Sequence, residues 1–450
     1  MSFIRAKSGL LITVSITILA LIGYYYGYLF PRPGVEAIES IRPPELEIEV
    51  VAEGLEFPTT MDFLGPDDIL VLEKNNGTVQ RILNGTMLAD PVLDVNVANK
   101  YERGMLGIAV LSREQLQENG STYVFLYFTE LDIEGSDICP TPNRCDSDHK
   151  LLGNRLYKYT FVNNKLVNPI LLIDLPASPI PAHNGGKILI DPDENIFFTI
   201  GDLNHRSATQ NFLNRTAFNE TSGIYRITQD GRAVEPIIGN EHPLDKYYAY
   251  GMRNSYGIDF DPVTGKLWDT ENGPAFGDEI NLVEPGFNSG WRKVQGIWDV
   301  NEVSAPGGRF NSTDLGSKVA LSPANLEDFE GKGKYSIPEF TWVNVTGPTA
   351  IKFLHSDKLG KKYQNDIFVG DYHQGNIYHF KLNQNRTALV LDGQLRDNIA
   401  NLPSETEVIK FGEGFGAITD IQVGPYDGYL YIVSYGLDGR IYRIVPASIS

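Results

Sequence analysis

The 450-residue chain is short of positive charge, of cysteine and of helical patterning. Its 38 Lys and Arg residues against 57 acidic ones leave a net charge of −19, so no nucleic acid is expected as a partner, because its phosphates would meet few cations. Beyond the first 30 residues no stretch has a long amphipathic period of helical type, which argues against a helical fold. Gly (44), Pro (26), Tyr (23) and Phe (22) are plentiful, which is typical of many short strands joined by turns.

Cysteine is represented only by Cys139 and Cys145, in the run CPTPNRC. Two cysteines alone argue against a zinc site, which needs four ligands. The intervening residues, two of them proline, suit a small disulfide loop in an oxidising compartment. We therefore predict a Cys139–Cys145 disulfide and a location outside the cytoplasm.

A long apolar run occurs at the N-terminus. Residues 8–30 carry no charge and are long enough to span a bilayer. Arg5 and Lys7 precede the run, which keeps the N-terminus inside and places the rest of the chain outside. We predict a membrane anchor over residues 1–30 and a Pro-rich linker over residues 31–44. A cleaved signal peptide is the alternative, although no A-x-A-like site follows and the run exceeds the usual length.

Glycosylation is a further expectation for a domain outside the cytoplasm. Eight N-x-S/T sequons occur, most of them in turn-like contexts, which is typical of a glycoprotein surface. They lie at Asn76, Asn84, Asn119, Asn214, Asn219, Asn311, Asn344 and Asn385.

One strand–turn–strand pattern recurs along the chain. Each copy has a short aromatic or β-branched strand, a Gly or polar turn and a second strand that often contains Tyr; the copies begin at residues 69, 123, 195, 266, 366 and 429. Six copies of about four strands each predict an all-β fold, a six-bladed β-propeller over residues 45–450. The ELEIEVVAEG segment near Glu45 is expected to close it against the last strands. A two-sheet sandwich array is the alternative, and residues 297–340 are expected to form a surface loop.

Several residues suited to catalysis or ligand binding lie between Tyr250 and Trp291. Arg253 offers a fixed fork of donors that suits an anionic or carbonyl oxygen. Asp278 and Glu279 are hard oxygen ligands, next to a Gly-Pro turn whose carbonyl groups can also face a cation. An ion pair between Arg253 and one of these acids on a solvated loop is the alternative interpretation.

A second motif, PAHNGG, contains His183 before Gly185 and Gly186. An imidazole can accept a proton near neutral pH. The two glycines present backbone that a flat ligand can approach closely. A structural or merely exposed histidine is the alternative.

The ordered set of motifs resembles the soluble quinoprotein glucose/sorbosone dehydrogenase family. The resemblance rests on AHNGG with FFTIGD, on YGMRNSYGIDFDPVTGKLWDTENGP with GDEINLVEPGFNSGW, on DIFVGDYHQGNIYHF and on the closing ITDIQVGPYDGYLYIVSYGLDGRIYRI. It runs from about Gly54 to Ile444. It implies a six-bladed propeller that holds calcium and pyrroloquinoline quinone (PQQ) at its mouth and oxidises an aldose, a small-molecule sugar, to a lactone. The sequence does not indicate the oligomeric state.

The resemblance also implies roles for single residues near the chemistry. His183 matches the base that takes the proton from the sugar's anomeric hydroxyl. Arg253 and Asn254 match the pair beside the quinone carbonyls, where Arg253 would stabilise developing negative charge. Glu102, in ERGMLGIAV, lies where the family has a polar residue near the substrate.

Calcium sites are implied in the same way. Gly273 and Pro274 match positions whose main-chain carbonyls hold the calcium of the cofactor. Glu279, next to Asp278, matches a residue of a second, structural calcium site.

The departures from the family pattern concern the cofactor's carboxylates. His373 stands where the family offers a Lys to the quinone, and Ala417 and Thr419 stand in place of two Arg residues. Ala182 replaces an acid before the histidine. Because PQQ carries three carboxylates, losing these cations should weaken its capture.

Three functions stay open on this sequence. The first is a membrane-anchored, outward-facing PQQ-dependent aldose dehydrogenase. The second is a non-catalytic propeller ectodomain that lost the quinone and binds a glycan or a protein. The third is a calcium-dependent hydrolase that uses the same mouth.

Overall fold

The computed structural model describes residues 39–112, 120–132, 150–204, 211, 220–300 and 326–448, which fall within one unit of the chain. The predicted anchor, the linker up to residue 38 and the predicted Cys139–Cys145 disulfide lie outside these residues. Within the described ranges, no helix has the length and hydropathy needed to cross a bilayer.

The six predicted strand–turn–strand copies are confirmed as antiparallel pairs. Their alternating aromatic and β-branched residues bury against neighbouring sheets, while Gly and polar residues form the turns. The pairs are β4 (Asp68–Glu73) with β5 (Thr78–Leu83), β9 (Thr122–Asp132) with β10 (Lys150–Val162), β13 (Ile196–Ile200) with β14 (Gly223–Ile227), β17 (Leu267–Glu271) with β18 (Asp278–Val283), β25 (Ile367–Asp371) with β26 (Ile377–Leu382), and β31 (Leu430–Tyr435) with β32 (Gly439–Pro446).

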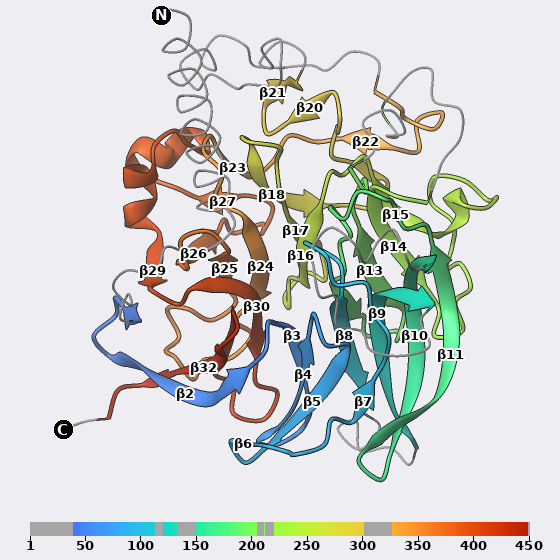
Figure 1. The fold of residues 1–450 in the computed structure, drawn as a ribbon. Coiled ribbons are helices and arrows are strands. Elements are labelled where there is room, and N and C mark those ends of the chain that lie inside the picture. The colour runs from blue at the N-terminus through green and yellow to red at the C-terminus, as the bar shows by residue number, and fades with distance from the viewer. Residues whose placement is uncertain are drawn as a thin grey trace, which may run out of the picture. The chain divides into compact units, whose positions relative to one another are not determined.

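One further strand precedes each pair and hydrogen-bonds to its first member. These inner strands contact one another in chain order, and the last contacts the first, so that they close a ring. They are β3 (Pro58–Gly65), β8 (Met105–Leu111), β12 (Ile188–Ile190), β16 (Ser255–Phe260), β24 (Pro348–Phe353) and β30 (Ala417–Val423). The fold is therefore an all-β propeller (Figure 1).

Outer strands complete the sheets. The described strands form six sheets of four to six strands and one two-stranded pair. The outer strands are β1 (Ser40–Ile41), β2 (Leu46–Leu55), β6 (Thr86–Met87), β7 (Leu93–Asp94), β11 (Lys165–Leu175), β15 (Tyr247–Tyr250), β19 (Phe287–Asn288), β22 (Lys334–Tyr335), β23 (Phe340–Trp342), β27 (Leu389–Val390), β28 (Ile399–Ala400) and β29 (Lys410–Glu413), and the separate pair is β20 (Val294–Gln295) with β21 (Trp298–Asp299). The described helices are short 3-10 turns, η1 (Leu244–Lys246), η3 (Gly393–Asp397) and η4 (Pro403–Val408).

The N-terminal segment closes the propeller as predicted. Strand β2 pairs with β32, so the first and last parts of the described chain share one sheet. In Figure 1 this sheet carries both the blue and the red ends of the colour scale.

Of the surface loop predicted over residues 297–340, residues 301–325 lie outside the described residues, and the prediction is wrong for part of the remainder. Phe340 begins β23, which pairs with β18, and both Phe340 and Trp342 are buried. Short strands β21 and β22 also fall in this segment. Strand β23 has only three residues, follows a Gly- and Ser-rich segment and pairs with β18 far away in the sequence, so the local pattern did not indicate it.

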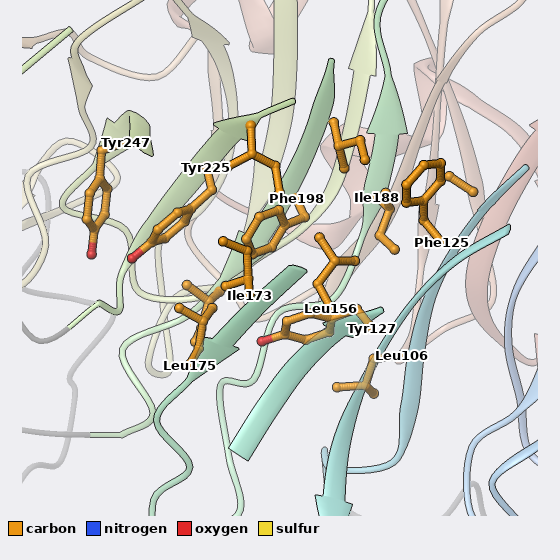
Figure 2. Packing of buried hydrophobic residues seen from close by; sticks show 14 of the residues in the cluster. Leu106, Phe125, Tyr127, Leu156, Ile173, Leu175, Ile188, Phe198, Tyr225 and Tyr247 are labelled. Atoms are coloured by element: carbon orange, nitrogen blue, oxygen red, sulfur yellow. The ribbon is translucent and has the colours of Figure 1, made fainter. Parts of the chain in front are cut away.

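Aromatic side chains fill the space between neighbouring sheets. Figure 2 shows one such cluster, in which Tyr127 of β9 approaches Phe198 of β13. The centroids of these two rings are 5.9 Å apart, and Phe198 stacks on Tyr225 at 5.1 Å. Each fully buried large side chain contributes about 1.5–3 kcal/mol, so this packing fixes the sheets relative to one another.

Buried ion pairs lie on the inner strands. Lys187, just before β12, and Asp420 of β30 form a pair of 2.5 Å between Nζ and Oδ1, although these strands are not neighbours in the ring. Lys352 and Asp259 join β24 to β16 at 3.0 Å. These contacts connect different sheets of the propeller.

The described sequons lie at the surface. Asn84, Asn344 and Asn385 are exposed. Asn76 is half-buried, and its side chain donates a hydrogen bond to Glu56. The other four sequons fall outside the described residues.

We predict that Lys187→Met lowers the free energy of unfolding by about 3–5 kcal/mol, because it leaves the buried Asp420 carboxylate without its counterion. Denaturant titration would measure this loss. The matched control is Lys266→Met at the exposed Lys266–Glu284 pair, which should cost less than about 1 kcal/mol. Equal effects of the two substitutions would contradict the role of the buried pair.

Candidate active site

His183 and Asp202 form the centre of the candidate site. His183 precedes β12 and Asp202 directly follows β13, so the antiparallel pairing of these strands brings the two together. His183 Nδ1 lies 2.5 Å from Asp202 Oδ1. The second carboxylate oxygen accepts a hydrogen bond of 2.8 Å from the Trp291 indole. All three side chains are buried.

The Asp202 carboxylate is held in its charged form. Burial alone would raise its pKa, but the hydrogen bond and charge of His183, the charge of Arg253 and the Trp291 hydrogen bond bring the pKa below its usual value. A charged carboxylate favours the tautomer of His183 with the proton on Nδ1. His183 Nε2, which has no hydrogen-bond partner among the described residues, can then accept a proton.

The His183 backbone is fixed in an uncommon conformation. Its φ is +60°, and its N–H donates to Glu102 Oε2 at 2.5 Å. Positive φ at a non-Gly residue costs free energy and is found mainly where surrounding contacts enforce it. Glu102 thus contacts the candidate base directly.

Gly185 and Gly186 have a different role from the predicted one. A Cβ on Gly185 would lie 2.5 Å from the Thr199 carbonyl oxygen, and one on Gly186 would lie 2.5 Å from Leu106 Cβ. The glycines therefore let the protein's own strands pack closely beside His183, and the space on the Cβ side of each is occupied by the protein itself.

Arg253 and Asn254 lie beside this pair, as predicted. The Arg253 carbonyl accepts a hydrogen bond of 2.8 Å from the Asp202 N–H, and Asn254 Oδ1 accepts one of 3.3 Å from the Gly185 N–H. The guanidinium lies over the Trp291 ring, 5.6 Å from its centroid. Two motifs that are far apart in the sequence thus meet at one place.

The Arg253 guanidinium is pre-positioned and retains free donors. Its Nη1 donates to the Asn272 carbonyl at 2.7 Å, and its backbone N–H donates to Glu271 at 2.7 Å. Burial lowers its pKa, while the charges of Asp202, Glu102, Asp278 and Glu271 oppose that shift, and a guanidinium stays charged in proteins. Its other N–H groups have no acceptor among the described residues.

Asp278 anchors the turn that contains Gly273 and Pro274. Its carboxylate accepts hydrogen bonds from the backbone N–H groups of Gly273 (2.7 Å), Thr346 (2.7 Å) and Gly347 (2.8 Å). Gly273 cannot be replaced, because a Cβ there would lie 2.0 Å from the Phe276 carbonyl oxygen. The metal-ligand role of Asp278 stays a prediction beside this anchoring role.

Glu279 belongs to a buried group of acids that also contains Asp269 and Glu271. Glu271 and Glu279 are direct partners across β17 and β18, and all three are at most 1% exposed. The side chains of Ser255 and Asn281 lie beside the Asp269 carboxylate and partly offset the effect of burial on its pKa. The alternative ion pair between Arg253 and Asp278 or Glu279 on a solvated loop is wrong, because both acids are buried away from solvent.

Burial disfavours the ionised form of these acids. It raises the pKa of Asp269 to about 7 and, together with the charge of Asp269, the pKa of Glu271 to about 8. Burial and the charge of Glu271 also raise the pKa of Glu279. Asp269 and Glu271 were not among the predicted site residues, although the D-x-E alternation before the Gly-Pro turn places both on one face of β17.

In the described part of the chain, no group of three or more His, Cys, Asp or Glu side chains is arranged to hold a metal ion. The predicted calcium at Gly273 and Pro274 would depend on main-chain carbonyls, which are hard oxygen ligands as well.

The predicted cofactor-anchoring positions lie on neighbouring turns and strands. His373 is exposed in the turn after β25, and Thr419 donates a hydrogen bond of 3.1 Å to the Pro58 carbonyl. Ala417 is the cross-strand partner of Tyr435. None of these positions supplies a fixed positive charge.

Comparison with known proteins decides the family. The family model described as "Glucose / Sorbosone dehydrogenase" matches residues 55–443. The chain belongs to the glucose/sorbosone dehydrogenase family. This family match confirms the resemblance inferred from the motifs.

Two characterised relatives illustrate the match. The chain is 22% identical to the aldose sugar dehydrogenase YliI of Escherichia coli (strain K12) over 90% of this chain and 94% of that protein. It is 28% identical to quinoprotein glucose dehydrogenase B of Acinetobacter calcoaceticus over 51% of this chain and 56% of that protein.

Solved structures share the fold. The PQQ-bound aldose sugar dehydrogenase of Streptomyces coelicolor gives a TM-score of 0.59 at 22% identity, covering 90% of this chain and 99% of that chain. The apo-form of the soluble aldose sugar dehydrogenase of Escherichia coli gives 0.65 at 20% identity, covering 89% and 100%.

We predict that Asp278→Ala destabilises the protein by about 3 kcal/mol or more, because three buried N–H groups lose their acceptor. Amide hydrogen exchange should accelerate at Gly273, Thr346 and Gly347, with the exposed Asp357→Ala as control. If Asp278 acts chiefly as a metal ligand, its replacement will instead have an effect only when calcium is present.

Proposed function

We propose that this chain is a sugar dehydrogenase of the quinoprotein type that oxidises an aldose outside the cytoplasm. The observation that carries the proposal is the buried His183–Asp202 pair beside the Arg253 guanidinium, with one nitrogen of His183 and several Arg253 donors left open. This arrangement combines a proton acceptor with a positive charge at one place, which suits removal of a hydride from C1 of a sugar and of a proton from its hydroxyl group.

The residues present fit the reacting end of a quinone. Arg253 has free N–H donors for a quinone oxygen, and the Asn254 side chain is fixed next to it by its hydrogen bond from Gly185. Arg253 and Asn254 would hold the quinone carbonyls there. When bound, PQQ would supply a two-electron acceptor for the hydride that leaves C1 of the sugar.

The chain's own residues would handle the proton and the charge. His183 Nε2 takes the proton of the anomeric hydroxyl while C1 loses its hydride, which leaves a lactone. Asp202 stabilises the imidazolium that results and keeps its ring oriented. Arg253 would hold a quinone carbonyl oxygen, where its positive charge would offset negative charge. Glu102, which holds the His183 backbone, would lie near the sugar.

Calcium would bind at two places. The main-chain carbonyls of Gly273 and Pro274 would hold one ion next to the cofactor. Glu279, with Asp278 as its neighbour, would contribute to a second site, where the buried carboxylates of Asp269 and Glu271 would supply further hard oxygen ligands.

The proposal includes the architecture and the location. The closed ring of inner strands supports six blades. The apolar run over residues 8–30 supports a retained single-pass anchor, and the Cys139–Cys145 disulfide and the sequons agree with an extracytoplasmic glycoprotein.

A non-catalytic ectodomain that binds a glycan or a protein is the second candidate function. It is favoured by the lack of a fixed positive charge at positions 373, 417 and 419. It differs from the first candidate in that ligand binding would not depend on His183.

We predict that the PQQ- and calcium-loaded protein reduces an artificial electron acceptor in the presence of an aldose, and that His183→Ala lowers the rate at least about 100-fold, because proton removal typically contributes about 10²–10⁴-fold. Dye reduction would be followed by absorbance, and the melting temperature would show that the variant is folded. His379→Ala is the matched control, since that histidine pairs with Asp366 elsewhere in the fold. Equal rates for wild type and His183→Ala would contradict the proposal.

We predict that calcium raises the melting temperature and that chelator reverses the effect. Calcium at a free concentration 100 times its Kd stabilises the folded state by about 2.7 kcal/mol. Because burial disfavours the ionised form of Glu271 and Glu279, a cation that binds these acids should also displace protons, which calorimetry in two buffers would detect. Glu279→Gln should reduce both effects. If calcium changes neither the melting temperature nor the release of protons, the proposed metal sites are overturned.

A further inference from the structure

Aromatic side chains surround the three positions that lack a cation. Tyr372 directly precedes His373, Tyr435 is the cross-strand partner of Ala417, and Phe57 precedes Pro58, whose carbonyl binds Thr419. Phe57, Tyr372 and Tyr435 are all half-buried, so each keeps some exposure to solvent. We call Phe57, Tyr372 and Tyr435 the aromatic cluster.

The rings of the aromatic cluster contact one another. The centroids of Phe57 and Tyr435 are 5.3 Å apart, and those of Tyr435 and Tyr372 are 5.9 Å apart. The exposed ring of His373 continues the series at 5.7 Å from Tyr372. Such separations are in the range where aromatic rings attract each other.

The backbone fixes these rings in place. Phe57 has a φ of +53°, and two hydrogen bonds enforce this conformation. The Phe57 N–H donates to the Gly436 carbonyl, and the Phe57 carbonyl accepts a hydrogen bond from the Lys74 N–H. The Tyr372 N–H donates to the Gly347 carbonyl at 2.9 Å. Gly347 in turn donates to Asp278, which also holds the Gly273 turn. The aromatic cluster is therefore connected directly to the candidate active site.

The electrostatics beside the cluster do not favour a multiply charged anion. Glu102 accepts the hydrogen bond of the His183 N–H, and its charge adds to burial in raising the pKa of Tyr372, so this acid lies close to the candidate site. Arg253 supplies one positive charge. Lys74 is buried and already donates to Asn75 and to the Asn99 and Arg103 carbonyls. Among the described residues, an anion with three carboxylates would meet one cation, Arg253, and a nearby acid, Glu102.

We infer that the aromatic cluster holds the far end of a flat quinone by ring contact, and that the chain selects a quinone with few or no carboxylates over the tricarboxylate PQQ. The inference rests on the proposed function. Arg253 binds the quinone oxygens, while Phe57, Tyr372 and Tyr435 supply apolar area in place of ion pairs. Because ring contact is hardly screened by salt and exposed ion pairs are, the affinity should be nearly independent of ionic strength.

The test is quinone binding to the full-length, calcium-loaded protein in detergent, measured by calorimetry at low and tenfold higher salt. The two probes are PQQ and 1,10-phenanthroline-5,6-dione, a neutral fused-ring ortho-quinone. We expect the neutral quinone to bind at least as tightly as PQQ, with a Kd that changes less than about twofold with salt. Tyr372→Ala should weaken its binding about tenfold, and Tyr372→Phe, which keeps the ring, should not.

Two controls keep the result interpretable. Tyr426→Ala, at an exposed tyrosine in another turn, should leave binding unchanged. His373→Lys, in an exposed turn, should strengthen the binding of PQQ and make it salt-dependent, which supports the inference even if Tyr372→Ala fails to fold.

The other outcomes are distinct. PQQ that binds more tightly than the neutral quinone, with a Kd that rises steeply with salt and does not respond to Tyr372→Ala, overturns this inference and leaves the proposed function intact. If neither quinone binds, the inference and the quinoprotein function are both overturned.

Discussion

Closure of the strand ring is the constraint on which the rest of the structure depends. Each sheet buries apolar side chains only against its two neighbours, so an open array would leave the first and last sheets uncovered. The pairing of β2 with β32 removes that exposure by placing the beginning and the end of the propeller in one sheet. The Lys187–Asp420 pair adds a contact between strands that are not neighbours in the ring. Because the ring is closed, turns from distant parts of the sequence are held at fixed positions.

The candidate site uses this fixed arrangement. His183, Arg253 and Glu102 come from segments that precede three different inner strands, and their mutual contacts are made largely through backbone groups. Backbone contacts keep side chains such as His183 Nε2 and the Arg253 donors free for a ligand. The site is thus preorganised by the fold, which is the condition for electrostatic stabilisation of a reacting group.

Much of the fold could be predicted from the sequence, because the aromatic alternation of each strand pair is local. The closing strand and the presence of His183, Arg253 and Asn254 at one site also followed from the motifs. The His183–Asp202 contact could not, since it depends on the register of β12 against β13 across 19 residues. The same holds for strand β23, hidden in a Gly- and Ser-rich segment, and for Gly185, which is approached by the protein's own backbone.

Asp278 has a consequence for how this site can change over evolution. One carboxylate holds the turn at Gly273, which is the predicted calcium position, and the loop at Thr346 and Gly347, which carries the Tyr372 turn. The turn of the predicted calcium site and the loop next to the aromatic cluster are therefore both held by Asp278. Replacing Asp278 would disturb both at once, whereas the exposed His373 can vary alone. Diversity among relatives should accordingly accumulate at the rim and spare this carboxylate, whatever ligand each relative binds.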